Sequence, residues 1–126
     1  MPGTQKTVMI VEDEPDVSEL FAEMMRLSGL RVIKTYTSTP AMALIEQESP
    51  DLVILDVMMP DVSGLEVLTY LRSNPELASI PVVIVSAKAS PADIKAGLDA
   101  GATVYLTKPV GYTDLKAAVD RLLQAA

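Results

Sequence analysis

The segment Val8-Met9-Ile10-Val11-Glu12-Asp13-Glu14-Pro15 is the clearest indication of the fold class, because it changes from a short apolar run to the start of a helical pattern. Four consecutive apolar residues suit a strand that is buried on both faces. Pro15 stands early in the helical segment, where a missing N–H is harmless, and Gly29 follows its end. Between them, apolar residues recur at helical spacing at Val17, Leu20, Phe21, Met24 and Leu27. The stretch therefore predicts a β-strand followed directly by an α-helix.

The same change of pattern recurs four more times along the chain. Further strands are predicted at Val32-Ile33, Leu52 to Leu55, Val82 to Val85, and Val104 to Thr107. Capping boxes are predicted at Ser63-Gly64-Leu65-Glu66 and at Ser90-Pro91-Ala92-Asp93. The helices are expected from Thr39-Pro40 to about Glu48, after Ser63, from Ser90 to Gly101, and around Leu115, Val119 and Leu122. Strands and helices thus alternate strictly, five of each.

Strict alternation is typical of βαβ units, whose right-handed crossovers place helices on both faces of a parallel sheet. Three strands are wholly apolar and should be central, whereas the strands around Val32 and Val104 contain polar residues and suit the edges. The pattern predicts an α/β fold: a flavodoxin-like, doubly wound, five-stranded parallel sheet in the order 2-1-3-4-5. At 126 residues, we expect one domain spanning residues 1–126.

The composition excludes several classes of function. The chain has no cysteine and no histidine, which removes disulfides, thiolate and imidazole metal sites, and imidazole bases. A formal charge of −7 opposes binding to nucleic acid, which depends on neutralising phosphates with lysine and arginine. No apolar run approaches the roughly 20 residues of a membrane span, and no secretory signal begins the chain. We therefore expect a cytoplasmic protein that uses carboxylates, hydroxyls and amines, with neither nucleic acid nor membrane as a partner.

Polar residues follow the predicted strands where ligands bind in such sheets, at the carboxyl ends near the switch point between the first and third strands. They are Glu12 and Asp13, Asp56, Ser86, and Lys108. Clustered carboxylates repel one another unless a cation lies between them, and an all-oxygen ligand set suits Mg²⁺. Taken singly, each residue could be a helix cap, a turn residue or a solvated charge. Their joint placement instead indicates a site for Mg²⁺ and a phosphoryl group.

Four segments carry a family resemblance. They are Val11-Glu12-Asp13-Glu14, Leu55-Asp56-Val57-Met58-Met59-Pro60 with Gly64, Ser86-Ala87, and Gly101-Ala102 with Tyr105-Leu106-Thr107-Lys108-Pro109. In this order and spacing they resemble the receiver domains of two-component response regulators, over nearly the whole chain. The resemblance implies a phosphorylation-dependent signalling switch rather than an enzyme with a separate substrate.

The resemblance also implies the roles of the site residues. Asp56 would be the phosphoacceptor. Asp13 and Asp56 would bind Mg²⁺ directly and Glu12 through water, and the backbone carbonyl of Met58 would be a further ligand. Lys108, Ser86 and Ala87 would bind the phosphoryl oxygens.

Further expectations concern the switch and its partners. Ser86 would follow the phosphoryl group inward and Tyr105 would turn inward behind it, and the Lys108-Pro109 bond is cis in similar proteins. The donor would be a sensor histidine kinase, a phosphotransfer protein or a small phosphodonor. A downstream protein or effector domain would bind the face built from the fourth helix, fifth strand and fifth helix.

Alternatives fit the sequence less well. A haloacid-dehalogenase-type phosphatase would carry a second Asp where Met58 stands, and flavodoxins and P-loop NTPases need phosphate-binding loops that are missing here. A pure interaction module of the same fold should not retain all five site positions. Glu12, Ser86 and Val110 depart mildly from the commonest receiver pattern, and Thr103-Val104 leaves the partner open. Whether the chain acts alone or belongs to a larger regulator or hybrid kinase is also open.

Overall fold

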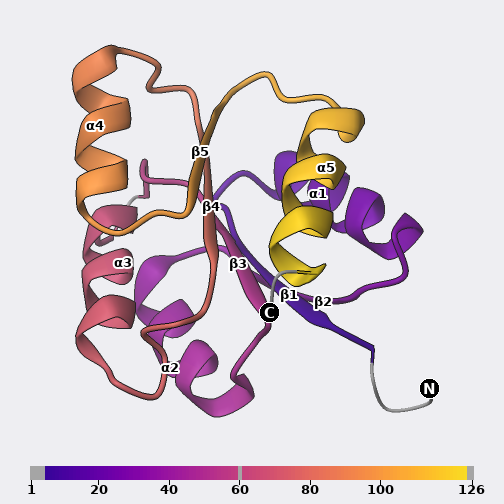
Figure 1. Cartoon of the computed structure of the whole chain (residues 1–126), viewed down its shortest axis with the longest axis horizontal. Coiled ribbons are helices and arrows are strands. Elements are labelled where there is room, and N and C mark those ends of the chain that lie inside the picture. The colour runs from indigo at the N-terminus through magenta and orange to yellow at the C-terminus, as the bar shows by residue number, and fades with distance from the viewer. Residues whose placement is uncertain (1–4, 60, 125–126) are drawn as a thin grey trace.

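The chain forms a parallel sheet of five strands with helices on both faces (Figure 1). A computed structural model describes residues 5–59 and 61–124, so Pro60 of the quoted motif lies outside the described residues. The strand order is β2-β1-β3-β4-β5, which confirms the predicted topology. The elements are β1 (Thr7–Val11), α1 (Pro15–Leu27), β2 (Arg31–Thr35), α2 (Ser38–Glu48), β3 (Leu52–Leu55), α3 (Gly64–Ser73), β4 (Val82–Ser86), α4 (Pro91–Asp99), β5 (Val104–Thr107) and α5 (Tyr112–Gln124).

The sheet separates two hydrophobic cores, because successive side chains of a strand point to opposite faces. Helices α1 and α5 cover one face, and α2, α3 and α4 cover the other (Figure 1). In β1, Val8 and Ile10 pack in the α1/α5 core, whereas Met9 and Val11 pack in the core beneath α2 and α3. Strands β3 and β4 alternate in the same way, which explains why all three sequences are continuous apolar runs.

The edge strands were predicted from their mixed composition, and the structure confirms them. Every described side chain of β3 and β4 is buried, whereas β2 begins with the exposed Arg31 and β5 ends with the exposed Thr107. Among the described residues, no helix is long and apolar enough to cross a membrane. The three buried strands hold their carboxyl ends in fixed register, and this register positions the polar residues that follow them.

Helix ends depart from the predictions in three details. Helix α2 begins at Ser38, one residue before the predicted Thr39, because Asp61 accepts hydrogen bonds from the backbone N–H groups of both residues (3.0 and 2.9 Å). The capping box predicted at Ser63 is wrong: its hydroxyl accepts from Leu65 N–H, not from Glu66 N–H.

At the start of α4, Ser90 Oγ accepts from Asp93 N–H (3.1 Å) as predicted. The Asp93 carboxylate, however, accepts from the Ser90 hydroxyl (2.8 Å), where a capping box would use the Ser90 backbone N–H. The cap therefore satisfies one backbone donor of the helix, and its second bond joins two side chains.

Helix α4 is attached weakly along its length. Of its two large aliphatic side chains, Ile94 is only partly buried and Leu98 is 45% exposed. The buried residue of the helix is Gly97, and a Cβ there would lie 2.7 Å from the ring of Tyr105. The ring of Tyr105 therefore packs directly against the backbone of α4 at Gly97, because glycine has no side chain to hold the two apart.

The C-terminal end of α4 is held more firmly than its body. Gly101, with φ of +115°, ends the helix in the left-handed region that glycine favours. The Arg72 guanidinium of α3 donates hydrogen bonds to the carbonyl groups of Gly101 (3.0 Å), Ala78 (3.0 Å) and Ile80 (2.7 Å). This arginine ties the α4–β5 turn to the loop before β4.

Candidate functional site

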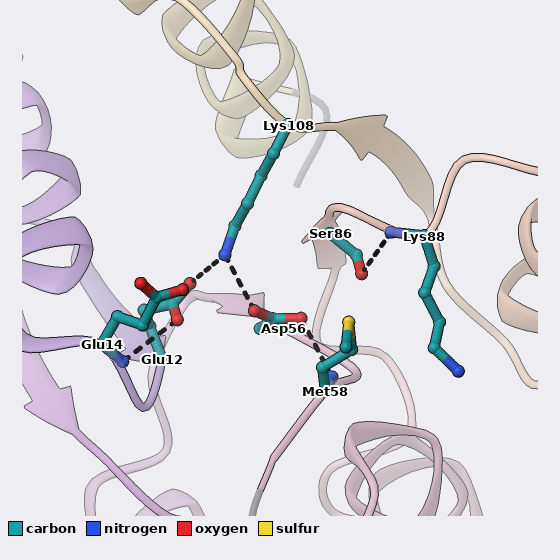
Figure 2. A network of polar contacts seen from close by, with 7 residues as sticks. All are labelled: Glu12, Glu14, Asp56, Met58, Ser86, Lys88 and Lys108. Carbon is teal, nitrogen blue, oxygen red and sulfur yellow. Dashed lines mark hydrogen bonds and ion pairs between the residues drawn. The ribbon is translucent and has the colours of Figure 1, made fainter.

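The candidate site lies at the carboxyl ends of β1, β3, β4 and β5 (Figure 2). Glu12 follows β1, Asp56 follows β3, Ser86 ends β4, and Lys108 follows β5. Glu12, Asp56 and Ser86 are buried, although all three are polar. Burying polar groups is costly unless they are paired, so their partners reveal what the site is built for.

Lys108 joins the two buried carboxylates. Its Nζ donates to Glu12 Oε1 at 2.8 Å and to Asp56 Oδ2 at 2.9 Å, across 96 and 52 residues of sequence (Figure 2). The second oxygen of Asp56 accepts from Met58 N–H at 3.0 Å, and the second oxygen of Glu12 accepts from Glu14 N–H at 3.2 Å. Each carboxylate is therefore oriented by two donors: the shared ammonium group of Lys108 and one backbone N–H.

Burial and charge perturb the acid and the base of this network differently. The pKa of Glu12 is raised, chiefly by burial and also by the charge of Asp56, although hydrogen bonds from Lys108 and Glu14 act to lower it. Burial acts to lower the pKa of Lys108, but its hydrogen bonds to Glu12 and Asp56, together with the charges of these carboxylates, leave the net pKa raised. Lys108 therefore stays charged at neutral pH.

A third carboxylate completes an acidic cluster. Glu12, Asp13 and Asp56 each offer one oxygen, and these three oxygens lie within 4.8 Å of one another. When all are ionised, their three negative charges face the single positive charge of Lys108. Two negative charges are left, which one divalent cation would offset. The oxygen donors suit a hard cation such as Mg²⁺, so the residues fit the metal that the sequence predicted.

Gly64 lets the first turn of α3 approach the segment that carries Asp56. A Cβ at this position would lie 2.7 Å from Val57 Cα and closer still to the backbone oxygen of Asp56. The Gly64 N–H also donates to Val57 O at 3.1 Å. This close approach is the physical reason for a glycine eight residues after Asp56.

The site lies within a region that matches a known protein family. The model of the response regulator receiver domain matches residues 8–120, which include every residue of the site. The chain belongs to the response-regulator receiver family. Receiver domains work in two-component signalling, where they interact with histidine kinases and effectors.

Solved structures agree with the family. The signal receiver domain of a signal transduction histidine kinase from Syntrophus aciditrophicus is 30% identical, with a TM-score of 0.90 over 96% of this chain and 92% of that chain. A CheY-like response regulator receiver domain protein from Methanospirillum hungatei is 27% identical, with a TM-score of 0.88 over 97% and 96% of the two chains.

The curated relatives are longer than this receiver domain. The phosphate regulon transcriptional regulatory protein PhoB of Pseudomonas aeruginosa is 32% identical over 119 residues, which are 94% of this chain and 52% of PhoB. A gliding motility regulatory protein of Myxococcus xanthus is 53% identical over 47 residues, which are 36% of this chain and 6% of that protein. The chain thus spans about half, or far less, of the curated relatives it matches.

Two further predicted residues of the receiver domain meet at the backbone of Lys88. Ser86 Oγ accepts from Lys88 N–H at 3.2 Å, and the Tyr105 hydroxyl donates to Lys88 O at 2.7 Å. Burial raises the pKa of Tyr105, so its hydroxyl remains a proton donor at neutral pH. Ala87, between the two hydrogen-bonded residues, is exposed, and the Lys108-Pro109 peptide bond is cis.

Asp61 is a supporting residue that sequence reasoning missed. Thr37, the N-cap of α2, makes no side-chain cap, and Asp61 takes this role from the β3–α3 loop. Buried Ser38 donates its hydroxyl to Val62 O at 2.6 Å and strengthens the same junction. These bonds anchor the β3–α3 loop, which begins at Asp56, to α2. Nothing in the sequence links Asp61 to a helix start 23 residues earlier.

Proposed function

We propose that this receiver domain accepts a phosphoryl group on Asp56 and thereby switches partner binding. The donor is the phosphohistidine of a sensor histidine kinase or phosphotransfer protein, or a small phosphodonor. The main support for this proposal is the buried carboxylate of Asp56. It is oriented by Lys108 Nζ (2.9 Å) and Met58 N–H (3.0 Å), and it lies beside two further carboxylates. A structural ion pair would need only one carboxylate for one ammonium.

Mg²⁺ is the proposed cofactor, held by the carboxylates of Asp13 and Asp56, by Glu12 through water, and by the backbone carbonyl of Met58. The carboxylate of Asp13 accepts no hydrogen bond from the described residues, so its oxygens are open to a cation. When bound, the metal supplies positive charge that offsets the charge on the transferred oxygens.

In the proposed transfer, a carboxylate oxygen of Asp56 forms a bond to phosphorus while the bond from phosphorus to the donor breaks in line. The product is an aspartyl phosphate. Lys108 moves from the carboxylate to the phosphoryl oxygens, and Ser86 and Ala87 contact the same oxygens. The domain catalyses only its own phosphorylation and dephosphorylation, so it does not turn over a separate substrate.

The output follows from the contacts of Ser86 and Tyr105. Both residues hold the backbone of Lys88, three residues before α4 begins. If Ser86 turns toward a phosphoryl group, it releases Lys88 N–H, and the Tyr105 contact is free to rearrange with it. The change would reach the α4-β5-α5 face, which we propose as the binding surface for a downstream protein or effector domain.

Incubation of the chain with acetyl phosphate and Mg²⁺, followed by intact mass measurement, tests this function. The wild type should gain one phosphoryl group, and a chelator should prevent the gain. Asp56→Asn should gain none, because an amide is a poor nucleophile and removes a charge from the metal site. Asp99→Asn makes the same chemical change on the exposed face of α4 and should label like the wild type. Full labelling of Asp56→Asn would disprove the assignment.

A further inference from the structure

Met58 is the most exposed methionine in the described part of the chain. It is 51% exposed, whereas Met9, Met24 and Met25 are exposed by 9% or less. Met42 and Met59 are partly buried against the core beneath α2 and α3. A small oxidant in solution therefore reaches the sulfur of Met58 before the sulfurs of these other methionines.

The exposed sulfur lies at the candidate site. Met58 lines a cleft of about 480 Å³ together with Asp13, Met59, Ser63 and Lys88. Figure 2 shows its side chain extending toward the side of the site where Ser86 and the Asp56 carboxylate lie. The backbone N–H of the same residue donates to Asp56 Oδ1 at 3.0 Å. A chemical change on this side chain therefore occurs next to the phosphoacceptor.

We propose that Met58 is a peroxide-sensitive modification site, and that its oxidation to the sulfoxide shortens the life of the phosphorylated state. The effect on the phosphorylated state rests on the proposed function. Hydrogen peroxide supplies the oxygen: a sulfur–oxygen bond forms while the peroxide O–O bond breaks. The sulfur loses two electrons, and the peroxide is reduced to water. The modification can be reversed by methionine sulfoxide reductase.

The kinetic effect follows from hydrogen bonding in the cleft. A thioether is a weak acceptor, so Met58 cannot hold a water molecule well. The sulfoxide oxygen is polar and accepts hydrogen bonds. Lys88 lines the same cleft and forms no ion pair with the described residues, and the side-chain acceptors there are Asp13, which would hold the proposed metal, and Ser63, so a sulfoxide would add a new acceptor. A water held beside Asp56 is oriented for attack on phosphorus, and orientation accelerates such reactions.

The modification is tested on the full chain with limiting hydrogen peroxide, intact mass and a peptide map. The first oxygen atom should be found on Met58. Met58→Leu, which keeps an apolar side chain without sulfur, should resist the same treatment at this peptide. An oxygen found on Met9, Met24, Met25, Met42 or Met59 before Met58 overturns the proposal.

The kinetic effect is tested by phosphorylating treated and untreated chains with acetyl phosphate and Mg²⁺ and following decay after donor removal. The oxidised wild type should lose its phosphoryl group at least about threefold faster. Reductase treatment should restore the slow rate, and Met58→Leu should decay at one rate before and after peroxide. Equal decay rates for oxidised and untreated wild type overturn the proposed effect of oxidation on phosphoryl lifetime. If the untreated chain takes up no phosphoryl group, the proposed function is wrong, and so is this effect. The peptide map then still tests whether Met58 is the modification site.

Discussion

Replacing Gly64 by alanine should destabilise the receiver domain and impair phosphoryl uptake. The added Cβ would lie 2.7 Å from Val57 Cα and closer to the backbone oxygen of Asp56. Carbon atoms in ordinary contact are about 3.5 Å apart, so the start of α3 would have to move by roughly 1 Å. Both neighbouring atoms belong to the backbone and cannot rotate away.

Two opposing effects determine the size of the change. Alanine at a compatible position stabilises by about 0.4–1 kcal/mol, because it restricts the unfolded chain. Overpacking a dense interior costs about 1–3 kcal/mol and sometimes more. Because the clash involves backbone atoms on both sides, the cost should dominate, with a net loss of about 1–2 kcal/mol in the free energy of unfolding. The domain would still fold at this cost.

The function should suffer beyond the loss of stability. A displacement of about 1 Å in the segment that carries Asp56 can slow a positioned reaction by up to about 100-fold. Urea unfolding followed by far-UV circular dichroism measures the stability, because the chain has no tryptophan to serve as a fluorescent probe. The phosphoryl uptake rate, measured by intact mass at equal folded fraction, reports the displacement.

Gly111→Ala is the matched control. No heavy atom lies within 4 Å of a Cβ built at Gly111, and its φ is not in the left-handed region. We expect its unfolding free energy to stay within about 1 kcal/mol of the wild type, the difference that alanine makes at a helix start. A Gly64→Ala protein as stable as the wild type, with unchanged uptake, would refute the reasoning.

Three further predictions concern other parts of the molecule. Backbone amides of α4 should exchange with solvent faster than those of β1, β3 and β4, because Gly97 is its buried residue and Leu98 is 45% exposed; equally slow exchange would contradict a mobile helix. Hydrogen bonds from Ser38 and Thr39 lower the pKa of Asp61, so its stabilisation is present above an unfolded pKa of about 3.9 and is lost as pH falls through the lower folded pKa. Urea unfolding should therefore show that Asp61→Ala differs most from the wild type at neutral pH, and a gap that persists undiminished at pH 2 would count against this. Met58→Asn combined with Lys88→Glu should speed loss of the phosphoryl group roughly tenfold or more, equivalent to about 1.4 kcal/mol, because each change adds an acceptor for water; an unchanged decay rate after donor removal would show that neither side chain controls the water.

The fold could be predicted from local patterns because burial leaves a periodic signal. A continuous apolar run such as Val82 to Val85 marks a strand buried on both faces, and polar residues around Val32 and Val104 mark the edges. Helix starts and helix packing were less predictable. The start of α2 depends on Asp61, 23 residues away, and α4 packs against the Tyr105 ring through Gly97, while Leu98 is exposed.

Which residues gather at the site could be predicted from the order of the chain. In a parallel sheet, the residues that follow the strands share one edge, so Glu12, Asp56 and Lys108 could be placed together without coordinates. Their hydrogen-bond partners could not be predicted in this way. Lys108 pairs with both carboxylates at 2.8 and 2.9 Å, and Ser86 and Tyr105 share the backbone of Lys88. Such bonds require specific distances and directions between side chains from different elements, and the periodicity of a single element contains no information about them.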